Sequence, residues 1–426
     1  MEIPKGYKHT EVGIIPQDWQ AAPLSIIGEV KMCKRVMKYQ TSETGDVPFY
    51  KIGTFGKEPD AFISRQLFEE FKSKYNYPGK GTILLSAAGT IGRTVRFDGK
   101  DAYFQDSNIV WIDNDETKVL NDYLFYCYTN VDWQTEDGGI VTRLYNGNLR
   151  ATNISFPKSL VEQRLIVAAI SEIDELITEL GKQIEKKRQI KEGAMYQLLT
   201  GKKRLKEFAN SANFKITEVG EIPEDWDVAS IDKLCSLKAR IGWQGLTTEE
   251  YLSEGDYLLI TGTDFLDGYI AWQNCFFVSK WRYEQDRNIQ IKEGDVLITK
   301  DGTIGKVAFI LNIPKPGTLN SGVFVVRPKR DDIIIKPFLS WLFKSIWFKK
   351  FIDQLTAGST INHLYQKDFV NFKLVFPKNL KEQSVIASFL SSMDEEISVL
   401  EAERDKYTLI KQGMMQELLT GKIRLI

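Results

Sequence analysis

Apolar residues recur every three or four positions in the stretch from Leu160 to Thr200. A mean spacing of about 3.5 residues predicts a helix that lies along a partner helix, because it confines the apolar side chains to a narrow seam. At about 1.5 Å per residue the helix would be roughly 60 Å long. The seam positions are Ile166, Ile170, Ile173, Ile177, Leu180, Ile184, Ala194 and Leu198. A seam this narrow needs a partner to bury it.

The partner is in the same chain. A second seam repeats the register at Ile386, Leu390, Met393, Ile397, Leu400, Tyr407, Met414 and Leu418. The flanking sequences repeat as well: FPKSLVEQ, from Phe156, returns as FPKNLKEQ, and LLTGKKRL, from Leu198, returns as LLTGKIRL. The two long helices are therefore expected to pair with each other.

Polar residues and glycines interrupt both seams. The polar positions, which are expected to fix the register of the pair, are Lys187, Lys191, Arg404 and Lys411. Gly193 and Gly413 occupy equivalent sites, and a glycine inside a helix costs about 1 kcal/mol relative to alanine. Either these glycines allow a close approach of the two helices, or they are simply tolerated.

The whole chain is a tandem duplication. A segment that we call the strap reads TEVGIIPQDW at residues 10–19 and TEVGEIPEDW at residues 217–226. The order is strap, globular head, long helix, repeated once, and such self-similarity decides the architecture. Two equal helices after two heads favour antiparallel pairing.

Within each head, short apolar runs alternate with turn residues. GTILLSAAGTIGRTVRF, from Gly81, and GDVLITKDGTIGKVAFI, from Gly294, predict a strand, a glycine-rich turn and a second strand. Residues 120–130 and 336–352 are expected to be helical, and residues 138–153 and 357–372 to form polar closing loops. The remaining segments align poorly between the heads. A repeated frame with unlike heads suits a protein that reads two different half-signals.

These motifs together resemble the specificity subunit of Type I restriction-modification enzymes, and the resemblance spans essentially the whole chain. It implies an α+β fold: two mixed α/β target recognition domains separated by two long helices that form an antiparallel coiled coil, with an internal pseudo-twofold repeat. The expected boundaries are 1–158 and 206–378 for the strap-and-head regions and 159–205 and 379–426 for the helices. The implied partners are double-stranded DNA with a split asymmetric target, two methyltransferase subunits and restriction subunits.

The glycine-rich turns are the first candidates for DNA contact. Their backbone N–H groups can approach a phosphate, and a cation follows each turn directly. The candidate residues are Thr90, Arg93, Lys300, Thr303 and Lys306. The alternative is an ordinary hairpin turn with a solvated cation.

The closing loops and one further segment carry base-reading chemistry, because arginine pairs with guanine and asparagine with adenine. The candidates in the closing loops are Arg143, Tyr145, Asn146, Thr360, Asn362, His363 and Tyr365. Those in a glycine-rich segment unique to the second head are Arg240, Trp243 and Gln244. For any one of them, packing against the rest of the head is the competing explanation.

Composition narrows the class of protein further. The 426 residues are 43% hydrophobic and 27% charged with a net charge of −1, so any DNA-binding surface depends on local clusters of Lys and Arg. No signal peptide or membrane span is expected. The four cysteines are widely separated and there are two histidines, which predicts buried thiols in a reducing cytoplasm and no metal site.

Catalytic functions are the first rival hypothesis. The chain contains no Pro-Pro dipeptide for an adenine methyltransferase motif, and GTIGK from Gly302 departs from a phosphate-binding loop. Asp60 and Glu70 mimic a nuclease site, but Leu67, Phe68 and Phe71 beside them predict an amphipathic helix. No catalytic residue and no cofactor is therefore expected. A coiled-coil scaffold that binds protein is the second rival.

Overall fold

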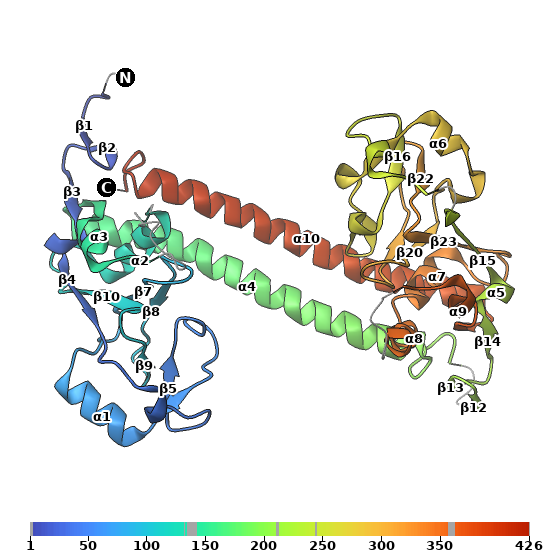
Figure 1. Ribbon diagram of the computed structural model, residues 1–426, viewed down its shortest axis with the longest axis horizontal. Coiled ribbons are helices and arrows are strands. Elements are labelled where there is room, and N and C mark those ends of the chain that lie inside the picture. The colour runs from blue at the N-terminus through green and yellow to red at the C-terminus, as the bar shows by residue number, and fades with distance from the viewer. Residues whose placement is uncertain are drawn as a thin grey trace. The chain divides into compact units, whose positions relative to one another are not determined.

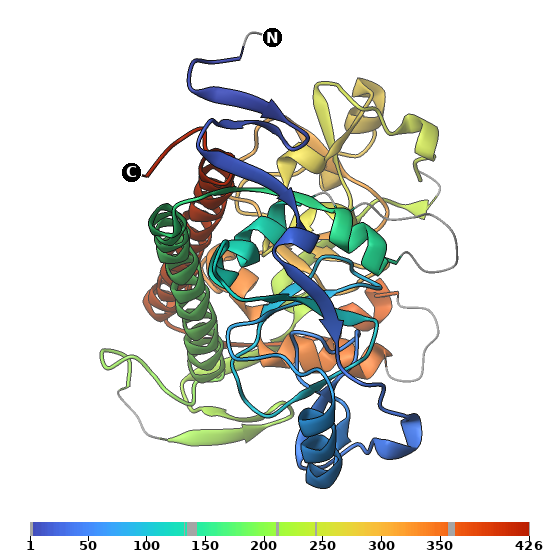
Figure 2. The same ribbon diagram turned by 90° about the vertical axis from the view of Figure 1, so that its left-hand side faces the viewer.

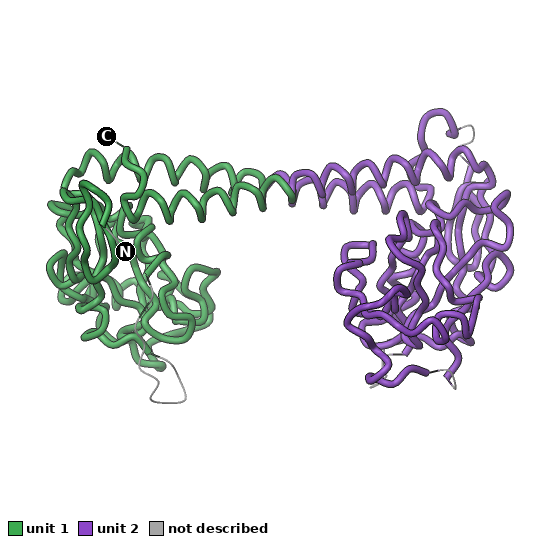
Figure 3. Tube along the Cα trace, turned by 90° about the horizontal axis from the view of Figure 1, so that it is seen from above, with its two compact units in different colours: residues 1–181, 402–426 green, residues 182–401 purple. Residues whose placement is uncertain are grey.

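The computed structural model describes residues 3–131, 133, 143–209, 213–242, 245–356 and 363–425. It divides into two compact units, residues 1–181 with 402–426 and residues 182–401 (Figure 3). Each unit contains one strap, one head and a part of each long helix. We call the heads of these units head 1 and head 2.

Head 1 is built on a four-stranded antiparallel sheet. Its strands follow the order β4 (Gly28–Met32), β10 (Ile109–Asn114), β7 (Ile83–Ser86), β8 (Thr94–Arg96). Ile83 and Leu85 enter one hydrophobic core, whereas Leu84 enters another on the opposite face. Burial on both faces explains why Ile83, Leu84 and Leu85 of β7 are all apolar rather than alternating with polar residues. A smaller sheet adjoins it, in the order β6 (Phe62–Ile63), β5 (Val47–Tyr50), β9 (Tyr103–Phe104).

Head 2 repeats this plan. Its four-stranded sheet has the order β15 (Cys235–Ala239), β23 (Val323–Pro328), β20 (Val296–Thr299), β21 (Val307–Phe309). Its smaller sheet has the order β19 (Phe276–Val278), β16 (Tyr257–Ile260), β22 (Gly317–Leu319). The extra hairpin β17 (Phe265–Leu266) and β18 (Tyr269–Ile270) lies in this head. The two heads thus share a fold that their sequences had obscured.

Each strap closes its head. Strands β1 (Tyr7–Thr10) and β2 (Gly13–Pro16) form a hairpin, and β3 (Trp19–Pro23) pairs with β11 (Asn153–Pro157). In unit 2 the corresponding strands are β12 (Phe214–Thr217), β13 (Gly220–Pro223), β14 (Trp226–Ser230) and β24 (Lys373–Pro377). Trp19 and Trp226 are fully buried. The tryptophan that ends each strap motif is therefore a core residue.

The predicted long helices are α4 (Leu160–Leu199) and α10 (Leu380–Leu418), which lie side by side within each unit (Figures 1 and 2). The seam prediction is confirmed by burial of residues along both helices, including Ile166, Ile170, Leu180, Ile184, Ile386, Leu390, Ile397 and Leu418. Among the described residues, no helix combines the length and apolar character needed to cross a membrane.

Ion pairs along the seam establish the antiparallel pairing. Lys191 Nζ lies 2.5 Å from Asp394 Oδ1, and in unit 1 Lys411 Nζ lies 2.5 Å from Asp174 Oδ1. These two pairs are related by the internal repeat, since each residue of one pair corresponds to a residue of the other. In each pair the lysine lies toward the C-terminal end of its helix and the aspartate toward the N-terminal end of the partner helix, so the two helices run antiparallel. The lysines act as the polar seam positions that the sequence predicts.

The glycines do not bring the helices together. A Cβ atom added at Gly193 or Gly413 would meet no atom within 4 Å, so the close-approach hypothesis is wrong and both glycines face open space.

An ionic cluster with a buried glutamate at its centre links the strap, the start of one long helix and the segment that follows the other helix in each unit; we call it the clamp. In unit 1, Arg424 donates to Glu162 (Nε to Oε1, 2.5 Å) and to Asp18 (Nη2 to Oδ2, 2.7 Å). In unit 2, Arg204 donates to Glu382 (Nη2 to Oε2, 2.6 Å) and to Asp225 (Nη1 to Oδ1, 2.8 Å). Glu162 and Glu382 are buried, so each requires its arginine. This cluster explains why the glutamate of the EQ motif, the arginine of the RL motif and the aspartate of the DW motif recur in both units.

The neighbouring glutamines attach each head to its helix. Gln163 accepts from Leu120 N at 2.8 Å and donates to the carbonyls of Lys118 and Pro157. Gln383 makes the same three contacts with Ile335, Ile333 and Pro377. Each glutamine side chain therefore fixes the loop that leads into the helices of its head.

The helices of the heads agree partly with the sequence analysis. α2 (Asn121–Asn130) confirms the first helical prediction. The second predicted helix, 336–352, is instead two helices, α7 (Lys336–Leu342) and α8 (Ile346–Thr356). At the turn between them, Lys344 N donates to Trp341 O at 3.0 Å, and the hydroxyl of buried Ser345 donates to the Leu342 carbonyl at 2.6 Å.

Removing a clamp arginine should destabilise the protein, because it leaves a buried carboxylate without its partner. We expect Arg204→Ala to lower the free energy of unfolding by about 3 kcal/mol, measured by denaturant titration. Arg330→Ala is the matched control, since Arg330 and its partner Asp332 are both exposed and should contribute less than about 1 kcal/mol. Equal effects of the two substitutions would contradict the role of the clamp.

Candidate nucleic-acid interface

The two glycine-rich turns have the same conformation. β7 pairs with β8, and β20 with β21, which confirms the predicted hairpins. Gly89 and Gly92 have φ of 67° and 81°, and Gly302 and Gly305 have 67° and 79°. These left-handed angles favour glycine and explain the repeated GTIG motif.

A buried hydroxyl holds each turn closed, and the sequence analysis missed it. Ser86 Oγ accepts from Arg93 N at 2.9 Å and donates to Thr90 O at 2.5 Å. Thr299 Oγ1 accepts from Lys306 N at 2.9 Å and donates to Thr303 O at 2.6 Å. The occurrence of Ser and Thr at equivalent positions before the two turns was the available signal.

The side chains of the turns differ in their freedom to reach a ligand. Thr90, Thr303 and Lys306 are exposed. Arg93 Nη1 donates to the carbonyl of Phe55 at 3.0 Å, and Lys300 Nζ lies 5.3 Å from the centre of the Phe324 ring.

The closing segment of each head lies directly against its turn. Arg143 forms a β-bridge with Ala88, and Leu144 N donates to Ala87 O at 2.9 Å. His363 forms the equivalent bridge with Asp301. The structure therefore gathers two of the predicted groups of candidates at one end of each sheet.

The closing segments are helical where loops were expected. Tyr145 and Tyr365 are the N-caps of α3 (Asn146–Ala151) and α9 (Gln366–Phe369), and both tyrosines are half exposed. Asn146 is thus the first residue of a helix. The loop prediction is wrong here because Leu149 and Phe369 are buried and hold each short helix against the core.

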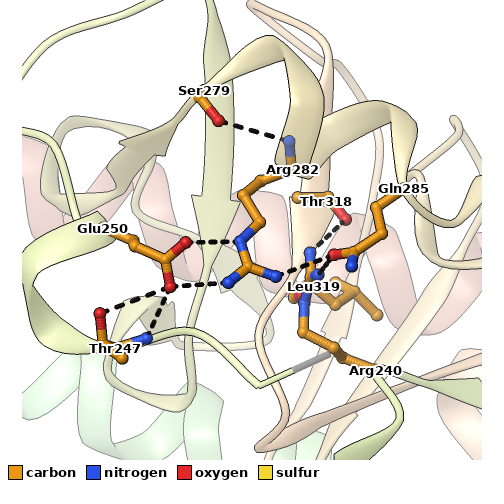
Figure 4. A network of polar contacts seen from close by, with 8 residues as sticks. All are labelled: Arg240, Thr247, Glu250, Ser279, Arg282, Gln285, Thr318 and Leu319. Atoms are coloured by element: carbon orange, nitrogen blue, oxygen red, sulfur yellow. Dashed lines mark hydrogen bonds and ion pairs between the residues drawn. The ribbon is translucent and has the colours of Figure 1, made fainter. Parts of the chain in front are cut away.

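Arg240 was predicted to contact DNA, but only 2% of its surface is exposed, so this prediction is wrong. Its guanidinium donates to the Leu319 carbonyl at 2.8 Å and to Thr318 Oγ1 at 3.2 Å (Figure 4). Gln285 Oε1 accepts from it at 3.2 Å, and burial lowers the pKa of Arg240. These contacts make Arg240 an internal support of head 2. Trp243, Gln244, Thr360 and Asn362 lie outside the described residues.

The residues that mimic a nuclease site do not converge. Asp60 pairs with Lys51 at 2.9 Å, and Glu70 pairs with Lys74 at 3.0 Å. α1 (Arg65–Lys74) confirms the predicted helix, with Phe68 buried beneath it. Within the described ranges, no group of three or more His, Cys, Asp or Glu residues could hold a metal ion.

Comparison with known proteins identifies the family. The sequence model of the Type I restriction modification DNA specificity domain matches residues 16–192 and 223–407, which is more than half of the chain. The chain is 28% identical to the putative type I restriction enzyme MjaX specificity subunit of Methanocaldococcus jannaschii, over 99% of this chain and 97% of that one. It is 59% identical to a putative specificity subunit of Haemophilus influenzae over 36% of this chain, an alignment that spans two fifths (40%) of that relative.

Solved structures share the fold. The S subunit of the Type I restriction-modification system of M. genitalium aligns over 98% of both chains, with a TM-score of 0.61 and 15% identity. A second structure, solved in work on the assembly and conformational transition of a type I system, aligns over 96% of this chain and 99% of that one, with a TM-score of 0.55 and 14% identity. With two matching domains, a duplicated frame and this fold, the chain belongs to the Type I restriction-modification DNA specificity family.

Proposed function

We propose that this chain is the DNA sequence-specificity subunit of a Type I restriction-modification complex. It binds a bipartite, asymmetric target and docks methyltransferase and restriction subunits. The observation that carries the proposal is the duplicated frame with two unlike heads: clamps, turns and helices repeat, whereas the candidate reading residues differ. The proposed boundaries are 1–158, 159–205, 206–378 and 379–426 for the two head regions and their helices.

The partners and location follow from this role. Double-stranded DNA binds the heads, two methyltransferase subunits supply the methyl transfer, and restriction subunits supply cleavage. The solved structure from work on complex assembly of a type I system supports such partners. Four buried free thiols favour a reducing cytoplasm, and no membrane is involved.

The chain acts without catalysis of its own in this proposal. The lack of a methyltransferase motif in the sequence supports this, as do the separate ion pairs of Asp60 and Glu70. A methylation assay on the isolated chain separates it from a catalytic methyltransferase. A mobility-shift assay with randomised duplexes separates it from a scaffold that binds protein.

The cations of the turns should contribute phosphate contacts. We expect Arg93→Ala or Lys306→Ala to weaken DNA binding similarly on all sequences and to reduce the slope of log K against log salt by about one unit. Lys100→Ala is the control, because Lys100 is exposed in the loop at the opposite end of β8 and should leave the slope unchanged. A changed base preference with an unaltered slope would instead assign these residues to base reading.

The heads should be independent readers. Replacing residues 227–375 with another head should change one half of the recognised sequence and preserve the other, because the clamps and helices remain. The measurement is the sequence methylated by the complex of the variant with its methyltransferase subunits. A simultaneous change in both halves would show that the heads do not read separately.

The long helices should set the unread gap between the half-sites. Four residues inserted between Gly181 and Lys182, and four between Glu401 and Ala402, add about 6 Å to each helix. A four-residue insertion is a stutter, which a coiled coil accommodates by local unwinding. Since about ten base pairs of DNA span roughly 34 Å, the gap should grow by one or two base pairs with both half-sites preserved.

The control is the same insertion in α4 alone, which shifts the Lys191–Asp394 pair out of register and should lower stability. An unchanged gap in an active variant with both insertions would show that the helices do not determine the spacing.

A further inference from the structure

Three segments meet at the same end of the central sheet in each head. In head 1, Ala87 N of the turn donates to Asn108 O at the start of β10, and Leu144 N of the closing segment donates to Ala87 O. In head 2, Lys300 N donates to Gly322 O at 2.9 Å, and Leu364 N donates to Lys300 O at 2.8 Å. The backbone arrangement is therefore the same, and it places Arg143 and His363 at equivalent points.

In head 1 the side chain at this point is held from the start of β10. Arg143 Nη2 donates to Asn108 Oδ1 at 2.6 Å. Asn108 follows a tight turn in which its N–H donates to Asp106 O at 2.6 Å and Ser107 has a φ of 53°. Left-handed backbone in a residue other than glycine is costly and concentrates at functional sites. The turn thus presents the Asn108 amide to the guanidinium at the cost of local strain.

In head 2 the corresponding side chain is held from the opposite direction. His363 Nδ1 contacts Asp301 Oδ1 of the glycine-rich turn, at the position that Ala88 occupies in head 1. Gly322 stands at the position of Asn108 and provides no side chain. Between head 1 and head 2, the bridging residue and the residue that holds its side chain therefore both differ, although the backbone bridge is the same.

This pattern is the opposite of that in the clamp. Arg204 with Glu382, and Arg424 with Glu162, keep the same residue types in both units because they maintain a common frame. A supported polar side chain that differs between two otherwise equivalent sites is expected where the two heads read different bases.

The chemistry of the two side chains fits base edges. A guanidinium has five N–H donors in a planar fork, and its contact with Asn108 uses one. Arginine presented in this way pairs with O6 and N7 of guanine. In His363 the contact of Nδ1 with Asp301 leaves Nε2 on the other side of the ring, which is partly exposed at 25%.

We propose that Arg143 and His363 are the base-reading residues at the equivalent point of the two heads, with Arg143 directed at a guanine. Asn108 and Asp301 are the positioning residues that hold them. This inference rests on the proposed function. Each head then has one base-reading side chain, located where the closing segment bridges the glycine-rich turn.

The test uses the complex with its methyltransferase subunits and selects methylated sites from a random DNA pool. Arg143→Ala should reduce the preference for guanine at one position of one half-site by about 10-fold or more. Asn108→Ala should relax the same position by roughly 2- to 10-fold. The double variant should match Arg143→Ala, because Asn108 acts through Arg143. His363→Ala and Asp301→Ala, tested as single variants, should both relax the base preference at the same position of the other half-site.

Asn114→Ala is the matched control. Asn114 lies at the opposite end of β10, where it donates to the Val119 carbonyl at 2.7 Å, and its loss should leave every base preference intact. Uniformly weaker selection with Arg143→Ala, or an Asn108→Ala variant indistinguishable from this control, would overturn the inference. A wild-type complex that selects no split sequence would instead contradict the proposed function.

Discussion

Each head depends on the end of a long helix, which completes its hydrophobic core. The core of head 1 includes Leu418 and Leu419 from the end of α10, and the core of head 2 includes Leu198 and Leu199 from the end of α4. The clamp arginine follows each of these helix ends and reaches the buried glutamate at the start of the other helix. Burial of that glutamate is costly, so the arginine must be present to pair with it. Antiparallel pairing of the helices is the arrangement that satisfies both units at once.

The features that repeat between the two units have a different role from those that differ between them. The frame consists of the clamps, the glutamine contacts and the Lys–Asp pair of the seam, each of which occurs twice with the same residue types. The end of each sheet that carries the glycine-rich turn retains the backbone contacts and exchanges the side chains. A second head with different chemistry can therefore occupy an equivalent frame without any change in the helices.

The sequence predicts the frame well because periodicity and repeats report it directly. The spacing of Ile166 and Ile170 defines the seam, and the repeat of GTIG defines the turns. The contact of Asn108 with Arg143 has no such signal, because it joins segments whose proximity arises from the folded sheet. Arg240 was misassigned because a glycine-rich segment suggests exposure, whereas the carbonyl of Leu319 and the hydroxyl of Thr318 provide buried acceptors. Similarly, the two heads share strand order although their sequences align poorly, since many apolar sequences fill the same two cores.

Two unlike heads on one frame should read two separate DNA half-sites. The most direct measurement is the set of sequences that the wild-type chain, assembled with its methyltransferase subunits, selects from a random DNA pool. We expect two short and different blocks of specified bases, separated by an unspecified gap of constant length. A single continuous sequence, or two identical blocks, would contradict it.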